Sequence, residues 1–93
     1  MGYNGHTGQL IGYFKANEDI MALIQADAKS NVNYIQHLGI QSEDDIVVMI
    51  NDKEIHIGKT RIYEIGDVEV VSLYLTQDSK DSVIIDYTIK LEE

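Results

Sequence analysis

The side chains best suited to metal chemistry are Glu54 and His56, which stand two positions apart. The segment around them is predicted to be a strand, so both side chains share one face and could contact the same ion. Two ligands do not complete a zinc site, and no further histidine or cysteine lies near them in sequence. The solvated outer face of a hairpin is the better interpretation, and we expect neither a metal nor a cofactor.

Carboxylates and hydroxyls are the next candidates. Residues 78–82 form an oxygen-rich loop, but they lack the alternate acids, the central glycine and the closing glutamate of an EF-hand. Asp44 with Asp45, or Asp86 with a partner, could act as general acid and base, yet aspartate is also common in turns. The chain contains no Gly-x-Ser-x-Gly elbow, no phosphate-binding glycine loop, no His-Glu zinc motif and no cysteine. We therefore expect no catalytic residues and no enzyme activity.

Aromatic and apolar side chains are suited to recognition. Tyrosine gives a large contact area at a low cost in conformational entropy, although strand tyrosines commonly pack at sheet edges with solvated hydroxyls. The predicted interface residues lie in the N-terminal third of the chain: Tyr3, Tyr13, Phe14, Ile20, Leu23 and Ile24. The predicted ligand patch consists of Tyr63, Glu64 and Tyr74. The absence of tryptophan weakens this patch as a carbohydrate site.

The charge of the chain argues against two classes of partner. Seven basic and sixteen acidic residues give a net charge of −9, and residues 41–93 hold five basic against thirteen acidic side chains, a balance of −8. Binding to nucleic acid or anionic lipid needs clustered lysine or arginine. The longest apolar run, residues 46–50, is far shorter than the roughly 20 residues of a membrane span. The sequence predicts no nucleic-acid, membrane or small-molecule partner, and the N-terminus lacks the pattern of a signal peptide.

One convincing helix is predicted, at residues 17–30. Asn17 suits the N-cap, and Glu18 and Asp19 place negative charge at the helix start. Apolar residues recur at spacings of three and four, at Ile20, Leu23, Ile24 and Ala28. Such a helix is marginal alone and must dock on a sheet or on another chain. Residues 1–16 are rich in glycine and are predicted to be an N-terminal arm with a first short extended segment.

Residues 17–93 are predicted to be a single domain, with antiparallel strands over residues 32–91. The expected strands are 32–40, 46–50, 54–57, 61–65, 68–75 and 82–91, with turns at 42–45, 51–53, 66–67 and 76–81. The wholly apolar strand 46–50 is expected to be covered on both faces. Turns every eight to twelve residues favour a mostly β fold with one N-terminal helix, a small antiparallel sandwich or barrel of six to seven strands. A chain of 93 residues has a thin core.

An ordered series of short motifs carries a likeness to a known family. The motifs are Tyr-Ile-Gln-His-Leu-Gly-Ile-Gln at 34–41, Ile-Asn at 50–51, Ile-His-Ile-Gly-Lys-Thr at 55–60, Ile-Tyr-Glu-Ile at 62–65, residues 70–75, and Ile-Ile-Asp-Tyr at 84–87. Residues 34–87 thereby resemble a small β-rich domain of structural, virion or tail-associated, proteins of phages and prophages of Gram-positive bacteria. The family usually has glycine where this chain has Asp52 and Arg61. The resemblance implies a role in virion assembly with no activity attached.

Two functions of different classes follow from the sequence. The first is a non-catalytic phage virion protein of the tail, baseplate or capsid surface, which binds copies of itself and other virion proteins. Its location would be the virion, after synthesis in the cytoplasm of the bacterial host. The alternative is a small β-sandwich that binds host cell-surface carbohydrate through the predicted ligand patch. The first function is favoured because a thin core cannot bury all of the apolar helix stripe and the sheet edges, and the surplus can be covered by symmetric association.

Overall fold

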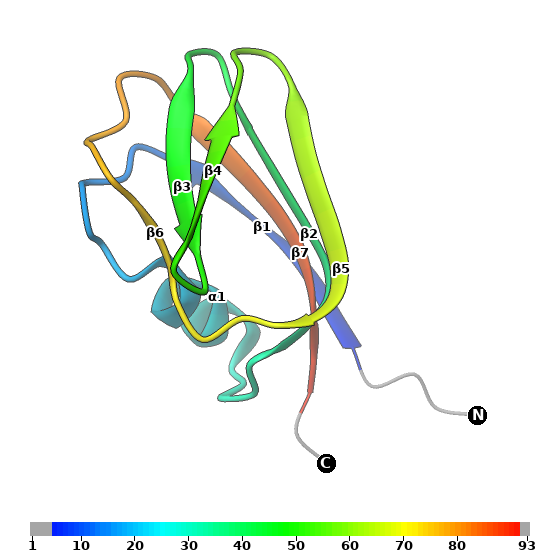
Figure 1. Ribbon diagram of the computed structural model, residues 1–93. Helices are drawn as coiled ribbons and strands as arrows, with labels where there is room; N and C mark the ends of the chain where they lie inside the picture. The colour runs from blue at the N-terminus through cyan, green and yellow to red at the C-terminus, as the bar shows by residue number, and fades with distance from the viewer. Residues whose placement is uncertain (1–4, 92–93) are drawn as a thin grey trace.

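A computed structural model describes residues 5–91 of the chain (Figure 1). In chain order its elements are β1 (Gly5–Gly12), α1 (Ile20–Ala28), β2 (Tyr34–Ser42), β3 (Ile46–Ile50), β4 (Lys53–Ile57), β5 (Ile62–Glu69), β6 (Leu73–Leu75) and β7 (Val83–Lys90). The chain is therefore mostly β with one helix near the N-terminus, as the sequence predicts.

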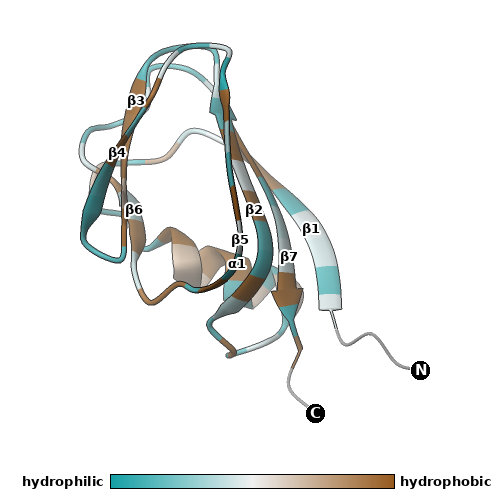
Figure 2. Cartoon of the chain, turned by 45° about the vertical axis from the view of Figure 1, so that its right-hand side comes forward, coloured by the Kyte–Doolittle hydropathy of each residue, from teal (hydrophilic) through white to brown (hydrophobic). Residues whose placement is uncertain are grey.

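The strands form two antiparallel sheets that face each other. The larger sheet has the order β1-β7-β2-β5, and the smaller has the order β4-β3-β6. Figure 2 shows the two sheets on either side of the molecule, with α1 between their lower ends. The predicted antiparallel sandwich is confirmed.

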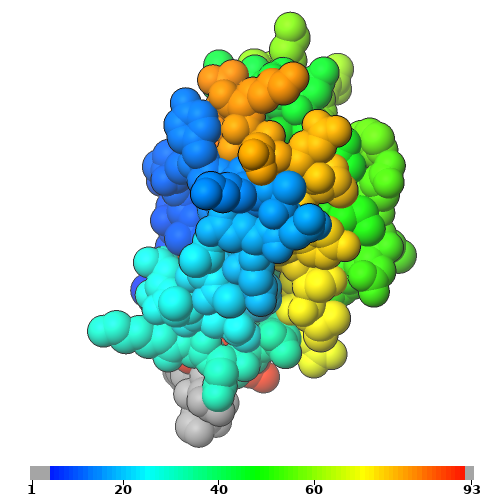
Figure 3. Space-filling view, turned by 90° about the vertical axis from the view of Figure 1, so that its left-hand side faces the viewer, coloured from blue at the N-terminus to red at the C-terminus, as the bar shows by residue number. Residues whose placement is uncertain are grey.

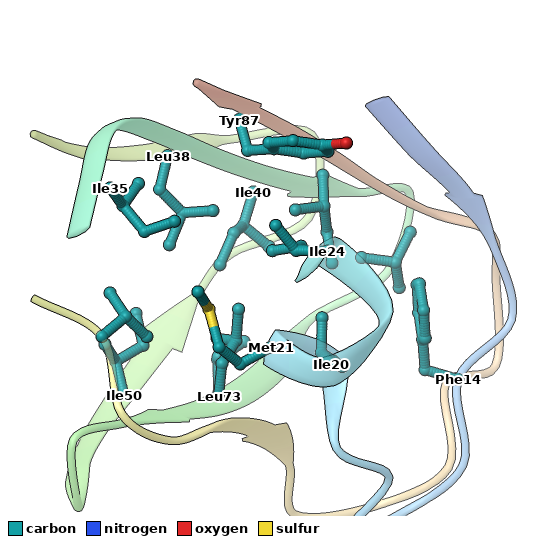
Figure 4. Packing of buried hydrophobic residues seen from close by; sticks show 14 of the residues in the cluster. Phe14, Ile20, Met21, Ile24, Ile35, Leu38, Ile40, Ile50, Leu73 and Tyr87 are labelled. Carbon is teal, nitrogen blue, oxygen red and sulfur yellow. The ribbon is translucent and has the colours of Figure 1, made fainter. Parts of the chain in front are cut away.

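Alternation of side chains along the strands builds the core. Along β7, buried positions alternate with half-buried or exposed ones, and β3 also places every second residue inside. The helix completes the core because Ile20, Met21 and Ile24 fill the space between the sheets (Figure 4). On the outer face of β3, Val47 and Met49 are only half-buried, so the expected cover on both faces of this strand is wrong.

The largest fully buried side chain, Tyr87, joins three elements. Its ring lies directly across from Gly8 in the pairing of β7 with β1, and its hydroxyl donates a hydrogen bond to Asp27 on α1. Burial, together with this hydrogen bond, raises the pKa of Tyr87 further above physiological pH, where the hydroxyl is already protonated and able to donate. A Cβ on Gly8 would lie 2.6 Å from Cζ of Tyr87, and only glycine leaves room for the ring.

The N-terminal part of the chain contains the predicted extended segment, but this segment belongs to the sheet and not to an arm. Residues 5–12 are not a free arm, because all eight pair with β7 as strand β1, and the first four residues lie outside the described part of the chain. Among the glycines that suggest a linker, Gly8 instead allows close packing. The single domain therefore includes β1 and does not begin at residue 17.

The helix is shorter than the predicted span of 17–30. Its N-cap is Asp19, whose Oδ1 accepts a hydrogen bond of 3.1 Å from the amide of Ala22. Asn17 cannot cap because its backbone is left-handed, with φ of 64°. Lys29, with φ of 56°, ends the helix in the left-handed conformation typical of a C-terminal cap.

Two turn predictions have different outcomes. The 51–53 turn is confirmed, since β3 and β4 form a hairpin around Asn51 and Asp52, which have φ of 50° and 66°. The turn predicted at 66–67 is wrong, because β5 continues through these residues to Glu69. Gly66 passes so close to β2 that an added Cβ would lie 2.9 Å from the carbonyl oxygen of Gln36. A glycine-aspartate pair here marks an irregularity within a strand.

The packing of Tyr87 gives a test with a matched control. Gly8→Ala should lower the free energy of unfolding by about 1–3 kcal/mol, because the new methyl group displaces the buried ring. Gly12→Ala, in the same strand but with nothing within 4 Å of its added Cβ, should leave stability unchanged. Urea denaturation followed by circular dichroism measures both, and equal effects would contradict the packing described for Gly8.

Candidate interaction surfaces

The candidate metal pair is present but incomplete. Glu54 and His56 lie on the exposed face of β4, where Oε2 of Glu54 is 2.5 Å from Nε2 of His56. Among residues 5–91, the structure brings together no group of three or more histidine, aspartate or glutamate side chains that could hold an ion. The pair therefore remains two side chains on the solvated face of a hairpin.

The oxygen-rich loop at 78–82 braces the main chain of a neighbouring segment. Oδ1 of Asp78 accepts a hydrogen bond of 2.8 Å from the amide of Ala16, and Oγ of Ser79 accepts one of 2.9 Å from the amide of Phe14. The amide of Ser79 in turn donates to the carbonyl of Phe14 at 2.9 Å. Figure 3 shows this loop, in orange, packed against the blue N-terminal segment. Asp78 and Ser79 therefore hold the main chain at Phe14 and Ala16 in place.

The candidate acid–base aspartates also bind the chain itself. Oδ1 of Asp45 accepts from the amide of Lys59 at 2.8 Å, and Oδ1 of Asp44 accepts from the amide of Asp45 at 2.8 Å. These two residues line a cleft of about 490 Å³ beside the 76–80 loop. Asp86 lies elsewhere, on the outer face of the larger sheet, and accepts from the side chain of Gln9 at 2.6 Å. Asp86 therefore has no role in that cleft.

The predicted ligand patch is wrong, because its three residues do not share a surface. Tyr63 is half-buried on the inner side of β5 and packs against the core. Glu64, the next residue, points to the outer face, where Oε2 lies 3.5 Å from Nε2 of His37. Tyr74 lies on β6 in the other sheet, across from Met49. Consecutive strand residues face opposite sides of a sheet, so this sequence neighbourhood could not form one patch.

The predicted interface residues divide into four groups. Phe14, Ile20 and Ile24 are buried in the core, with exposed fractions of 7%, 1% and 0%, so their assignment to an interface is wrong. The two sheets leave a space that the apolar stripe of the helix fills, and Leu23 is half-buried beside it. Tyr13 is 69% exposed and remains a candidate. Tyr3 lies outside the described residues.

A surface of which the sequence predicted only Tyr13 lies along β1, which within residues 5–91 is the last strand on its side of the larger sheet. We call residues 5–13 the β1 edge. They contain no lysine, arginine, aspartate or glutamate, and they include two exposed apolar side chains, Ile11 at 62% and Tyr13 at 69%. An open strand edge offers unpaired backbone groups to another strand, and natural edges are usually protected by charge. The sequence signal was the absence of charge in a chain of net charge −9.

The opposite edge of the larger sheet has a different character. β5 carries Glu64, Asp67 and Glu69 and no basic residue. An apolar groove of about 410 Å³ runs between β5 and β4, the last strand of the smaller sheet. We call it the β4–β5 groove. Its apolar lining is Ile50, Ile55, Tyr63, Ile65 and Val68, and the other lining residues are Asn51, Lys53, Gly66 and Asp67.

Asn51 lines this groove and fixes the chain that follows β5. Its side-chain amide nitrogen donates to the carbonyl of Glu69 at 2.7 Å. Its side-chain oxygen accepts from the amides of Val71 at 2.8 Å and Ser72 at 3.4 Å. The tight turn of the hairpin is thereby tied to the connection between the two sheets.

These bonds can be separated from the strain of the turn. Asn51→Ala and Asp52→Ala both place alanine at a left-handed position, but only Asn51→Ala removes the three side-chain hydrogen bonds. We expect Asn51→Ala to be less stable than Asp52→Ala by about 2 kcal/mol. Thermal unfolding of both variants measures the difference, and equal melting temperatures would show that Asn51 does not brace the connection.

Comparisons with known proteins add no family. No protein-family model matches the chain, and no curated protein and no solved structure matches it. The likeness to the phage structural domain therefore stays a prediction that rests on the residues quoted for it.

Proposed function

We propose that this chain is a non-catalytic structural protein of a phage virion, in the tail, baseplate or capsid surface, that assembles with copies of itself and with other virion proteins. The observation that carries the assembly role is the β1 edge, an uncharged open strand in a chain of net charge −9. The motif series over residues 34–87 supports the virion setting.

Charge makes β1 the preferred site for self-association. Two copies of a strongly acidic chain repel each other over most of their surfaces. Along the β1 edge there is no acidic residue to oppose the same residue of a second copy. At the other end of the sheet, pairing β5 with a second β5 would bring Glu64, Asp67 and Glu69 near their own copies. The β1 edge is therefore where two sheets can join at least cost.

Pairing of β1 with the β1 strand of a second copy would form an isologous dimer. Two β1 strands pair antiparallel about a two-fold axis and turn two four-stranded sheets into one continuous sheet. The exposed side chains of Ile11 and Tyr13 lie beside this seam, where the second copy would cover them. Hydrogen bonds between backbones supply the affinity, and the absence of bulky charged groups permits close approach.

Self-association can be tested with two matched substitutions. Ile11 and Ile62 stand at opposite edges of one row across the outer face of the sheet and are 62% and 58% exposed. Ile11→Glu should weaken the dimer by about tenfold or more, since it adds like charges at the seam. Ile62→Glu makes the same chemical change far from the seam and should leave the dimer intact. Light scattering coupled to size-exclusion chromatography, over a range of concentrations, measures both.

Salt supplies a second readout of the same surface. Because the repulsion between acidic chains is screened at high ionic strength, the unmodified dimer should tighten as salt rises. A clean monomer at high concentration and high salt would contradict self-association through β1. Equal weakening by Ile11→Glu and Ile62→Glu would contradict the choice of edge.

The virion setting needs its own test. In particles purified from a culture that produces them, mass spectrometry should detect this chain at a constant ratio to the major structural protein through successive density gradients. The expected ratio reflects repeated copies at fixed positions. If the particles band without the chain, while it stays in the soluble lysate, the virion assignment is wrong even if the dimer is real.

A further inference from the structure

The β4–β5 groove is an open side of the sandwich. β4 and β5 follow each other in the chain but belong to different sheets, so they face each other across the molecule without pairing. Figure 2 looks toward the space between them. The groove has a volume of about 410 Å³. Its side chains from β4 and β5 point inward and yet remain only half-buried, at Ile55, Tyr63, Ile65 and Val68.

Two properties of the groove define what would fill it. Its lining is mainly apolar, with Lys53 on the β4 side and Asp67 on the β5 side, so the occupant must bring apolar side chains into the space between the sheets and is opposed by a cation if it pairs along β4. Each of its long sides is the last strand of a sheet within the described residues, so unpaired backbone groups border it. An extended segment satisfies both demands, because it pairs with a strand edge and turns every second side chain inward.

The charge of β5 decides which side chains the bound segment should turn outward. β5 carries three carboxylates, at Glu64, Asp67 and Glu69, and neither lysine nor arginine. All three residues are exposed. A strand added beside β5 places its outward side chains next to this acidic row, where opposite charges are favoured and like charges are not. The same row disfavours a second copy of β5 as the occupant.

We propose that the β4–β5 groove binds an extended segment of another protein in which apolar residues alternate with lysine or arginine, paired along β5. The apolar residues cover Tyr63, Ile65 and Val68, and the cations lie beside the acidic row. This surface is separate from the β1 edge. A chain can accept such a segment whether or not it forms the β1 dimer, so the two proposals stand or fall independently.

A synthetic peptide serves as the probe. The octapeptide Lys-Val-Lys-Ile-Lys-Val-Lys-Ile, blocked at both ends, is titrated into the isotope-labelled chain and followed by nuclear magnetic resonance. Amide shifts should be confined to β4, β5 and the turns that join them. A peptide of the same composition, with all lysines first and all apolar residues last, cannot alternate and should bind at least about tenfold more weakly. Equal binding of the two peptides, or shifts centred on β1, would overturn the proposal.

Variants with equal charge change separate the groove from general attraction between an acidic protein and a cationic peptide. Glu64→Lys with Glu69→Lys alters the exposed side of β5 and should weaken binding by about tenfold or more and reduce its dependence on salt. Glu43→Lys with Asp81→Lys makes the same change at exposed loop positions and should have little effect. If both pairs weaken binding equally, the peptide recognises only net charge and the proposal is wrong. The Ile11→Glu variant should bind the peptide normally.

Discussion

The buried ring of Tyr87 is the contact on which the larger sheet and the helix both depend. It fills the inner face of β7, lies across from Gly8 of β1, and reaches Asp27 of α1 with its hydroxyl. The ring of His6 lies beside it at a centroid distance of 6.1 Å. A large aromatic side chain opposite a glycine lets β1 lie flat against β7. The position of β1 therefore follows from one large residue and one very small one, and the open edge exists because β1 docks.

The two ends of the larger sheet are chemically opposed. β1 is uncharged, whereas β5 is acidic and borders an apolar groove. Uniform charge at both ends would block association along the whole sheet, and uniform neutrality would allow copies to pair without limit. Under the two proposals, the neutral end of the sheet would form a closed pair and the acidic end would take a cationic partner. The asymmetry thus favours defined assemblies over open-ended ones.

The sequence predicts more of this fold than of its surfaces. Period-two patterning suffices for β2, β3, β4 and β7, and asparagine and aspartate at 51 and 52 suit the left-handed positions of the hairpin. It fails for the span predicted as one strand at 68–75, which is divided between the end of β5 and β6 in the other sheet. Composition misleads for residues 5–12, because the glycine that suggests flexibility at Gly8 is a packing requirement visible only beside Tyr87. The apolar stripe of α1 indicates that one face of the helix is buried. It does not indicate whether that face packs against the sheets of the same chain or against a second chain. Likewise, the groove is open because β4 and β5 belong to different sheets. No local sequence pattern indicates which sheet each strand joins.

The position of β7 in the sheet also sets the order of events during synthesis. β7 pairs with both β1 and β2, although β1 precedes it by more than seventy residues. Until residues 83–90 have left the ribosome, β1 has no strand to pair with, and contacts between such distant segments form slowly. Until then, the nascent chain does not present β1 as the edge of a folded sheet. In the proposed dimer, recruitment of a second copy through the β1 edge would become possible only after β7 has been synthesised, which would delay association until the larger sheet has formed.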